Sequence, residues 1–180
     1  MSLFERYRKE IIEQLKKELG LENNFEVPSL EKIVINCGLG SAADDQKVLD
    51  EVSSKIAKIT GQRPIITKAK AAIASFNIRK GQKIGIRVTL RGKKMYDFFE
   101  KFVSVVLPRL RDFRGVPLNS FDKRGNYSVG LKEIDVFPEV EVVKGNKETG
   151  LEVTFVTTAK DDEKAKKLLE ALGMPFQKQK

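Results

Sequence analysis

Hydrophobic and polar positions follow two different periods along the chain, and these periods predict helices and strands in an irregular order. Apolar residues three and four positions apart predict an amphipathic helix over residues 3–19. Ser2 and Glu5 can form a capping box at its start, and Gly20 ends it. Further helices are predicted over about 43–59, beginning at Asp44 and Asp45 and ending near Gly61, over 93–107, ended by Pro108, and over 161–173.

Strands are predicted where apolar residues alternate with polar ones or form short runs. The predicted strands cover residues 30–37, 64–69, 82–92, 126–134 and 150–158. No internal repeat or linker divides the chain. The pattern therefore predicts one α+β domain over residues 1–180, with a single sheet covered by helices on one face.

The alternation in two of these strands predicts which side of the sheet stays exposed. In 82–92, Ile84, Ile86, Val88 and Leu90 alternate with Gly85, Arg87, Thr89 and Arg91. In 30–37, Lys32 and Asn36 flank Val34 on one side, with Ile33, Ile35 and Cys37 on the other. We expect Lys, Asn, Thr and Arg side chains on a common exposed face, where they suit phosphate and ribose contacts. The alternative is an ordinary solvent-facing side of a sheet.

Charge is concentrated in the middle of the sequence. The chain has a formal net charge of +9, yet residues 52–96 hold twelve Lys or Arg and no Asp or Glu. Such a local excess creates a directed positive field, which favours a polyanionic partner.

Composition argues against several classes of function. The sequence has no His and only Cys37, so a Cys/His zinc site, a Ser-His or Cys-His nucleophile pair and an internal disulfide are all excluded. No paired carboxylates with suitable spacing are evident, so an enzyme is the weaker interpretation. No apolar run is long enough to span a membrane, and the N-terminus lacks an apolar signal core. We therefore expect a cytoplasmic protein.

One motif supports a rival interpretation. CGLGSAA, residues 37–43, has the G-x-G-x-x-A spacing of a dinucleotide-binding turn between a strand and a helix. An NADP-dependent enzyme would then use Lys68 or Lys70 for the 2′-phosphate. Against it, a later strand alternates instead of being buried, the order of elements is not βαβ, and two acids follow the turn. A tight glycine turn is the plainer interpretation. A third alternative, a peripheral membrane protein, lacks a basic amphipathic helix in the charged region.

Several long blocks resemble the bacterial-type ribosomal protein L5 family, the large-subunit proteins that bind 5S rRNA in the central protuberance. The blocks are VPSLEKIVINCGLG (27–40), ITGQRPIITKAKAAIASFNIRKGQKIGIRVTLRG (59–92), LPRLRDFRG (107–115), FDKRGNYSVGLKE (121–133) and TTAKDDEKAKKLLEALGMPF (157–176). The resemblance covers about residues 7–176 in the same order. It implies a concave, largely antiparallel sheet, no enzymatic activity, no cofactor, no small-molecule substrate and a place on the ribosome.

The resemblance also implies three contacts, besides neighbouring large-subunit rRNA and proteins. 5S rRNA would be bound by Lys32, Asn36, Gln62 and Thr89, with Arg63 and Arg91 as additions. P-site tRNA would meet the loop 75–82, through Ser75, Asn77, Arg79, Lys80 and Gln82. A bridge to the thirteenth protein of the small subunit, in its head, would come from 138–146, through Pro138, Glu139, Glu141 and Lys144.

Departures from the family pattern are few. Ala71 and Asn77 stand where relatives often have basic residues, so the tRNA contact would depend more on Arg79 and Lys80. Cys37 replaces a commoner methionine, and Lys123 a commoner glycine.

Overall fold

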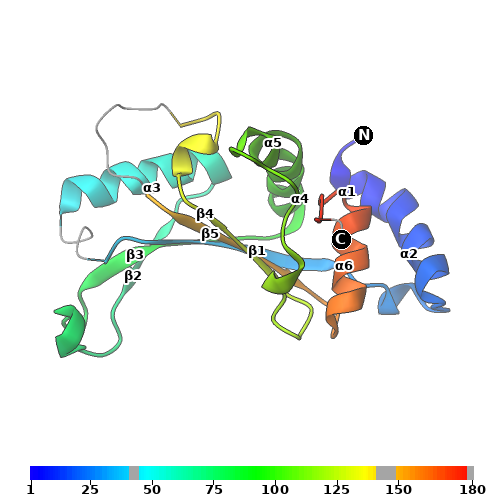
Figure 1. The fold of residues 1–180 in the computed structure, drawn as a ribbon, viewed down its shortest axis with the longest axis horizontal. Helices are drawn as coiled ribbons and strands as arrows, with labels where there is room; N and C mark the ends of the chain where they lie inside the picture. The colour runs from blue at the N-terminus through cyan, green and yellow to red at the C-terminus, as the bar shows by residue number, and fades with distance from the viewer. Residues whose placement is uncertain (41–44, 141–148, 178–180) are drawn as a thin grey trace. The chain divides into compact units, whose positions relative to one another are not determined.

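Figure 1 follows the fold along the chain in a computed structural model, which describes residues 1–40, 45–140 and 149–177. The strands are β1 (Leu30–Gly38), β2 (Ile65–Lys68), β3 (Lys83–Leu90), β4 (Tyr127–Leu131) and β5 (Leu151–Thr157). The α-helices are α1 (Leu3–Arg6), α2 (Ile12–Leu19), α3 (Gln46–Thr60), α4 (Gly92–Lys101), α5 (Leu107–Arg109) and α6 (Asp162–Ala171). Two π-helical stretches are η1 (Tyr7–Ile11) and η5 (Phe102–Val106). Short 3-10 turns are η2 (Asn24–Glu26), η4 (Ala74–Phe76), η6 (Leu118–Ser120) and η7 (Ile134–Val136).

The strands form one five-stranded antiparallel sheet in the order β2-β3-β1-β5-β4, which confirms the predicted α+β fold. All five predicted strands are present. The largest differences in length are at 82–92, which shortens to Lys83–Leu90, and at 126–134, which shortens to Tyr127–Leu131. The prediction that Arg91 belongs to the strand is therefore wrong. Arg91 directly precedes Gly92, which has a φ of +58° and is the first residue of α4.

The chain groups into two compact units. The first comprises Met1–Ile33, Leu90–Val129 and Thr154–Lys180, and the second comprises Val34–Thr89 and Gly130–Val153. The division of a chain into such units does not test whether it is one domain, so the single domain stays a prediction.

In the first unit, the predicted N-terminal helix is confirmed as the uninterrupted succession of α1, η1 and α2. Ser2 and Glu5 form the capping box: the Glu5 N–H donates to Ser2 Oγ at 3.4 Å and the Ser2 N–H to Glu5 Oε2 at 3.1 Å. Gly20 ends the helix in the left-handed conformation. Tyr7 is buried, and its hydroxyl donates to the Pro28 carbonyl at 3.0 Å.

The aromatic core of the first unit is made by the helix after β3 and by β5. Phe99 and Phe102 contact Phe155 with ring centroids 5.3 and 5.5 Å apart, and all three are fully buried. The helix continues through Pro108 to Arg109, so the predicted end at Pro108 is wrong by two residues. The π-helical stretch η5 directly precedes this last turn, and only Arg109 follows Pro108 before the helix ends.

In the second unit, α3 presents an apolar stripe of Leu49, Val52, Ile56 and Ile59, all buried. Asp45 caps its start by accepting the Lys47 N–H at 2.9 Å, and Gly61 ends it with φ of +62°. Asp44, the other predicted cap, lies outside the described residues. The stripe explains why the helix forms here: its apolar spacing supplies the core of this unit.

Candidate nucleic-acid interface

The two strands with the clearest alternation place polar side chains on a half-exposed face. On β1, Ile33, Ile35 and Cys37 are at most 1% exposed, while Lys32, Val34 and Asn36 are half-buried. On β3, Ile86, Val88 and Leu90 are buried, while Arg87 is exposed and Thr89 half-buried. Within the second unit, Asn36 and Thr89 thus lie on neighbouring strands and on the face opposite the buried residues, as predicted.

The register of the edge strand extends this face. Ile65 pairs with Arg87 and Thr67 with Gly85 in the antiparallel β2–β3 ladder. Residues directly opposite one another in a ladder share a face. The face therefore also carries the exposed Ile65, 73% accessible, and the half-buried Thr67.

Gln62 is tied to β3 by its own side chain. Its amide donates to the Thr89 carbonyl at 3.1 Å. The turn before it is held by Thr60, whose hydroxyl donates to the Ile56 carbonyl at 2.7 Å and accepts the Gln62 N–H at 3.3 Å. Gln62 and Thr89 are thereby brought together, although 27 residues separate them. Arg63 follows and is exposed.

Three neutral polar groups of the residues predicted to contact 5S rRNA, on this face or beside it, have no partner within the described part of the chain. They are the side-chain amide of Asn36, the hydroxyl of Thr89 and the amide oxygen of Gln62. All three residues are half-buried. Partly buried polar groups normally form hydrogen bonds. Because these three groups form none with the described residues, they are available to bond a ligand or water.

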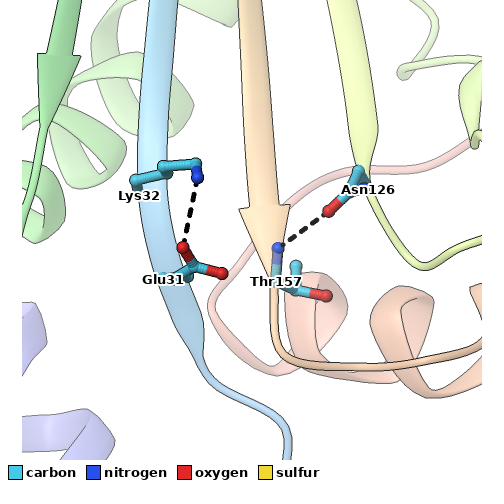
Figure 2. A network of polar contacts seen from close by, with 4 residues as sticks. All are labelled: Glu31, Lys32, Asn126 and Thr157. Atoms are coloured by element: carbon cyan, nitrogen blue, oxygen red, sulfur yellow. Dashed lines mark hydrogen bonds and ion pairs between the residues drawn. The ribbon is translucent and has the colours of Figure 1, made fainter.

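Lys32 and Arg91 belong to the first unit. Lys32 Nζ lies 3.2 Å from Glu31 Oε1, and Figure 2 shows this pair on β1. The two side chains are 29% and 51% exposed. An ion pair this accessible contributes little stability, so a phosphate can compete with Glu31 for the ammonium group. Arg91 is exposed.

Figure 2 also shows one of the bonds that hold the turn before β4 in the first unit: Asn126 Oδ1 accepts the Thr157 N–H at 3.2 Å. In addition, the Thr157 hydroxyl donates to the Gly125 carbonyl at 2.6 Å. Asp122 accepts the backbone N–H groups of Arg124 and Asn126 at 2.8 and 3.0 Å. These bonds fix a turn in which Lys123 has a left-handed backbone, with φ of +64°.

The loop between β2 and β3 is internally hydrogen-bonded. Ala69 and Gly81 close its base, with N–H bonds of 2.8 and 2.9 Å to the carbonyls of Gln82 and Ala69. Ile73 and Ile78 exchange two backbone bonds of 2.9 and 3.1 Å across its middle. The Gln82 side chain accepts the Arg79 N–H at 2.8 Å, which makes Gln82 a structural member of the loop.

Most side chains of this loop are exposed. Of the residues predicted to contact tRNA, Ser75, Asn77, Arg79 and Lys80 are exposed, and Gln82 is half-buried. Of those predicted for the bridge, Pro138 is exposed and Glu139 half-buried, whereas Glu141 and Lys144 lie outside the described residues.

Sequence reasoning missed three features of these surfaces. Arg87 was placed on the exposed face by alternation but not among the site residues. Ile65 and Phe76 are 73% and 72% exposed, and an apolar residue gives no sequence signal of exposure.

Cys37, by contrast, is an inert core residue, since burial raises the pKa of its thiol to about 11.

Comparison with known proteins identifies the family. A model described as "Ribosomal protein L5" matches residues 23–79, and a second model, which describes the C-terminus of the same ribosomal protein family, matches residues 83–176. The chain belongs to the bacterial-type ribosomal protein L5 family. Similar proteins named "Large ribosomal subunit protein uL5" are 53% identical in Carboxydothermus hydrogenoformans and 52% in Natranaerobius thermophilus, each over 97% of both chains. That of Thermoanaerobacter sp. strain X514 is 51% identical over 98% of both chains.

Membership of the L5 family decides between the interpretations left open by the sequence. The protein is a structural ribosomal protein and not an enzyme, and the resemblance found in the sequence is confirmed. The dinucleotide-binding alternative is wrong, because the chain belongs to a ribosomal protein family and because β3 lies between β1 and β2, which are adjacent parallel strands in a dinucleotide-binding βαβ unit. Among the residues that the structure describes, no helix is long and apolar enough to cross a bilayer.

Proposed function

We propose that this L5 family member is a constituent of the large ribosomal subunit and binds 5S rRNA through Lys32, Asn36, Gln62, Arg63, Thr89 and Arg91. Relatives that cover nearly the whole chain are named as large-subunit proteins, which supports the placement. The observation that carries the RNA interface is the set of unpartnered polar groups on Asn36, Gln62 and Thr89, beside exposed cations.

The two kinds of side chain serve binding differently. Lys and Arg side chains neutralise phosphates and release counterions, so their contribution to affinity falls as salt rises. The Asn36 amide and the Thr89 hydroxyl hydrogen-bond ribose or base edges, and these bonds do not depend on counterion release. An exposed patch of cations alone would bind many RNAs, whereas neutral groups at defined positions favour one fold.

The same proposal assigns the remaining predicted contacts. The loop 75–82 contacts the elbow of P-site tRNA, chiefly through the exposed Arg79 and Lys80. The segment 138–146 forms the bridge to the thirteenth protein of the small subunit; residues 132–170 sum to a charge of −3, which suits a basic partner.

The test is a binding titration of the purified protein with 5S rRNA and with an unrelated structured RNA of similar length. At moderate salt we expect clear preference for 5S rRNA, with a slope of log K against log salt of about −4, as expected for four to five phosphate contacts. Equal affinity for both RNAs would contradict the proposal.

Single substitutions locate the interface. Asn36→Ala and Thr89→Ala should each weaken 5S rRNA binding by about 1–3 kcal/mol, because a hydrogen-bonding group of the RNA is left unpaired. Their urea midpoints should stay those of the wild type, since neither side chain has a protein partner in the described residues. Asn119→Ala, at an exposed asparagine of η6, is the matched control. Arg79→Ala should leave 5S rRNA affinity nearly intact, and an equal loss there would refute the division between sheet and loop.

A further inference from the structure

The β2–β3 loop presents an aromatic side chain to solvent. Phe76, the last residue of η4, is 72% exposed, and Ile73 nearby is 46% exposed. An isolated exposed apolar residue is common on proteins, but two in one short loop are less so. Figure 1 shows this short turn between β2 and β3.

The loop holds Phe76 in a defined place. The Phe76 N–H donates to the Ile73 carbonyl at 3.3 Å, and Asn77 follows in the left-handed conformation with its N–H on the Ala74 carbonyl at 3.1 Å. The Ile73–Ile78 bonds close the turn behind them. Since the backbone is hydrogen-bonded on both sides, little ordering of the loop is needed when the ring meets a ligand.

The charged residues of the same loop and of its flanks indicate the chemistry of the partner of Phe76. Lys68, Lys70, Arg79 and Lys80 are all exposed, and the sequence has no acid between Glu51 and Asp97. An apolar protein surface would not need so many cations. A bilayer would need a larger apolar face than Phe76 and Ile73 provide. An aromatic ring among cations matches single-stranded RNA, whose unstacked bases lie on aromatic side chains while its phosphates meet Lys and Arg.

We propose that Phe76 stacks on an unpaired base of the RNA that this loop contacts, with Arg79 and Lys80 on the flanking phosphates. This rests on the tRNA contact proposed above and adds to it a recognised group, a base exposed in an RNA loop. The ring provides affinity that salt does not erode, because stacking releases no counterions.

The test uses the full-length protein and a tRNA transcript with 2-aminopurine at an unpaired position of the T loop. Wild-type protein should quench the fluorescence on binding. Phe76→Leu keeps an apolar side chain but removes the aromatic face, so it should bind about tenfold more weakly and give no quench at saturation. Phe76→Tyr should restore both. None of these changes should move the urea midpoint, because the ring is exposed.

Arg79→Ala separates the two proposals. It should weaken binding and make the salt slope shallower by about one, while quenching at saturation persists. If Arg79→Ala behaves so and Phe76→Leu binds and quenches like the wild type, stacking is refuted and the tRNA contact survives. If the wild-type protein does not bind the tRNA, or if Arg79→Ala binds as well as the wild type, the loop contact itself fails, and the stacking proposal fails with it.

Discussion

Gly85→Ala is expected to destabilise the protein because β1 and β3 approach each other closely at this glycine. A Cβ added to Gly85 would lie 2.5 Å from the Cys37 carbonyl oxygen and 3.3 Å from Thr67 Oγ1. Gly85 does not have a positive φ, so alanine can adopt its backbone conformation. The effect of the substitution is therefore steric, and it acts on the two strands that carry Asn36 and Thr89.

The size of the effect follows from the distances. The Cβ and the carbonyl oxygen must move apart by about 0.9 Å to reach ordinary contact at 3.4 Å. A shift of that size would stretch the nearby bond from the Leu39 N–H to the Ile84 carbonyl, now 3.0 Å, beyond hydrogen-bonding distance. Overpacking and a lost hydrogen bond each cost about 1–3 kcal/mol, and partial relaxation relieves some of this. We expect the free energy of unfolding to fall by about 2 kcal/mol.

Urea unfolding followed by circular dichroism measures this directly. With a slope of about 2 kcal/mol per molar urea, the midpoint should fall by about 1 M. Gly38→Ala, on the neighbouring strand β1 and also without a positive φ, is the matched control, because its added Cβ would meet nothing within 4 Å. 5S rRNA affinity should fall in Gly85→Ala and not in Gly38→Ala. A Gly85→Ala midpoint equal to that of the wild type would refute the reasoning.

Two further predictions concern the turn before β4. Lys123→Gly should raise the free energy of unfolding by up to about 1 kcal/mol in urea titrations, because it removes a side chain from a left-handed position, whereas Arg124→Gly should lower it. Burial raises the pKa of Asp122, but hydrogen bonds from the Asn126 side chain and from backbone N–H groups outweigh it, so the pKa lies below its ordinary value of 3.8. The ionised Asp122 carboxylate therefore stabilises the fold fully above about pH 3.8, and this stabilisation is lost as the pH falls through the pKa of the folded protein. When the free energy of unfolding is measured at decreasing pH, it should fall less in Asp122→Asn than in the wild type. Equal falls in the two proteins would contradict this.

The exposed face could be predicted because it depends on local periodicity. A strand turns successive side chains to opposite faces, so the buried Ile33, Ile35 and Cys37 determine where Lys32 and Asn36 lie. The same rule placed Thr89. Arg91 is exposed as the rule predicts, but the predicted strand extends too far, because β3 ends at Leu90 and a helix begins at Gly92.

Other parts of the site depend on contacts between distant residues, which alternation does not encode. The bond from Gln62 to the Thr89 carbonyl requires the turn after α3 to lie against β3. The exposure of Phe76 could not be predicted either, because the sequence does not indicate that no apolar core lies next to this phenylalanine. Backbone strain is a third case: no local pattern of this sequence marks Lys123 as left-handed, and only the glycine that the family commonly has there points to its φ of +64°.

The proposed interface combines groups whose contributions respond differently to salt, and this has a consequence for specificity. Raising the salt weakens the contacts of Arg63 and Arg91 with any RNA, but it leaves the hydrogen bonds of Asn36 and Thr89 largely unchanged. Discrimination between 5S rRNA and other RNAs should therefore persist as total affinity falls. Asn36→Ala should reduce that discrimination with an unchanged salt slope, and Arg63→Ala should make the slope shallower with little change in discrimination. Titrations of both variants against two RNAs at two salt concentrations measure the discrimination between the RNAs and the salt slope separately. If each variant loses discrimination and also has a shallower slope, the two kinds of group do not act independently.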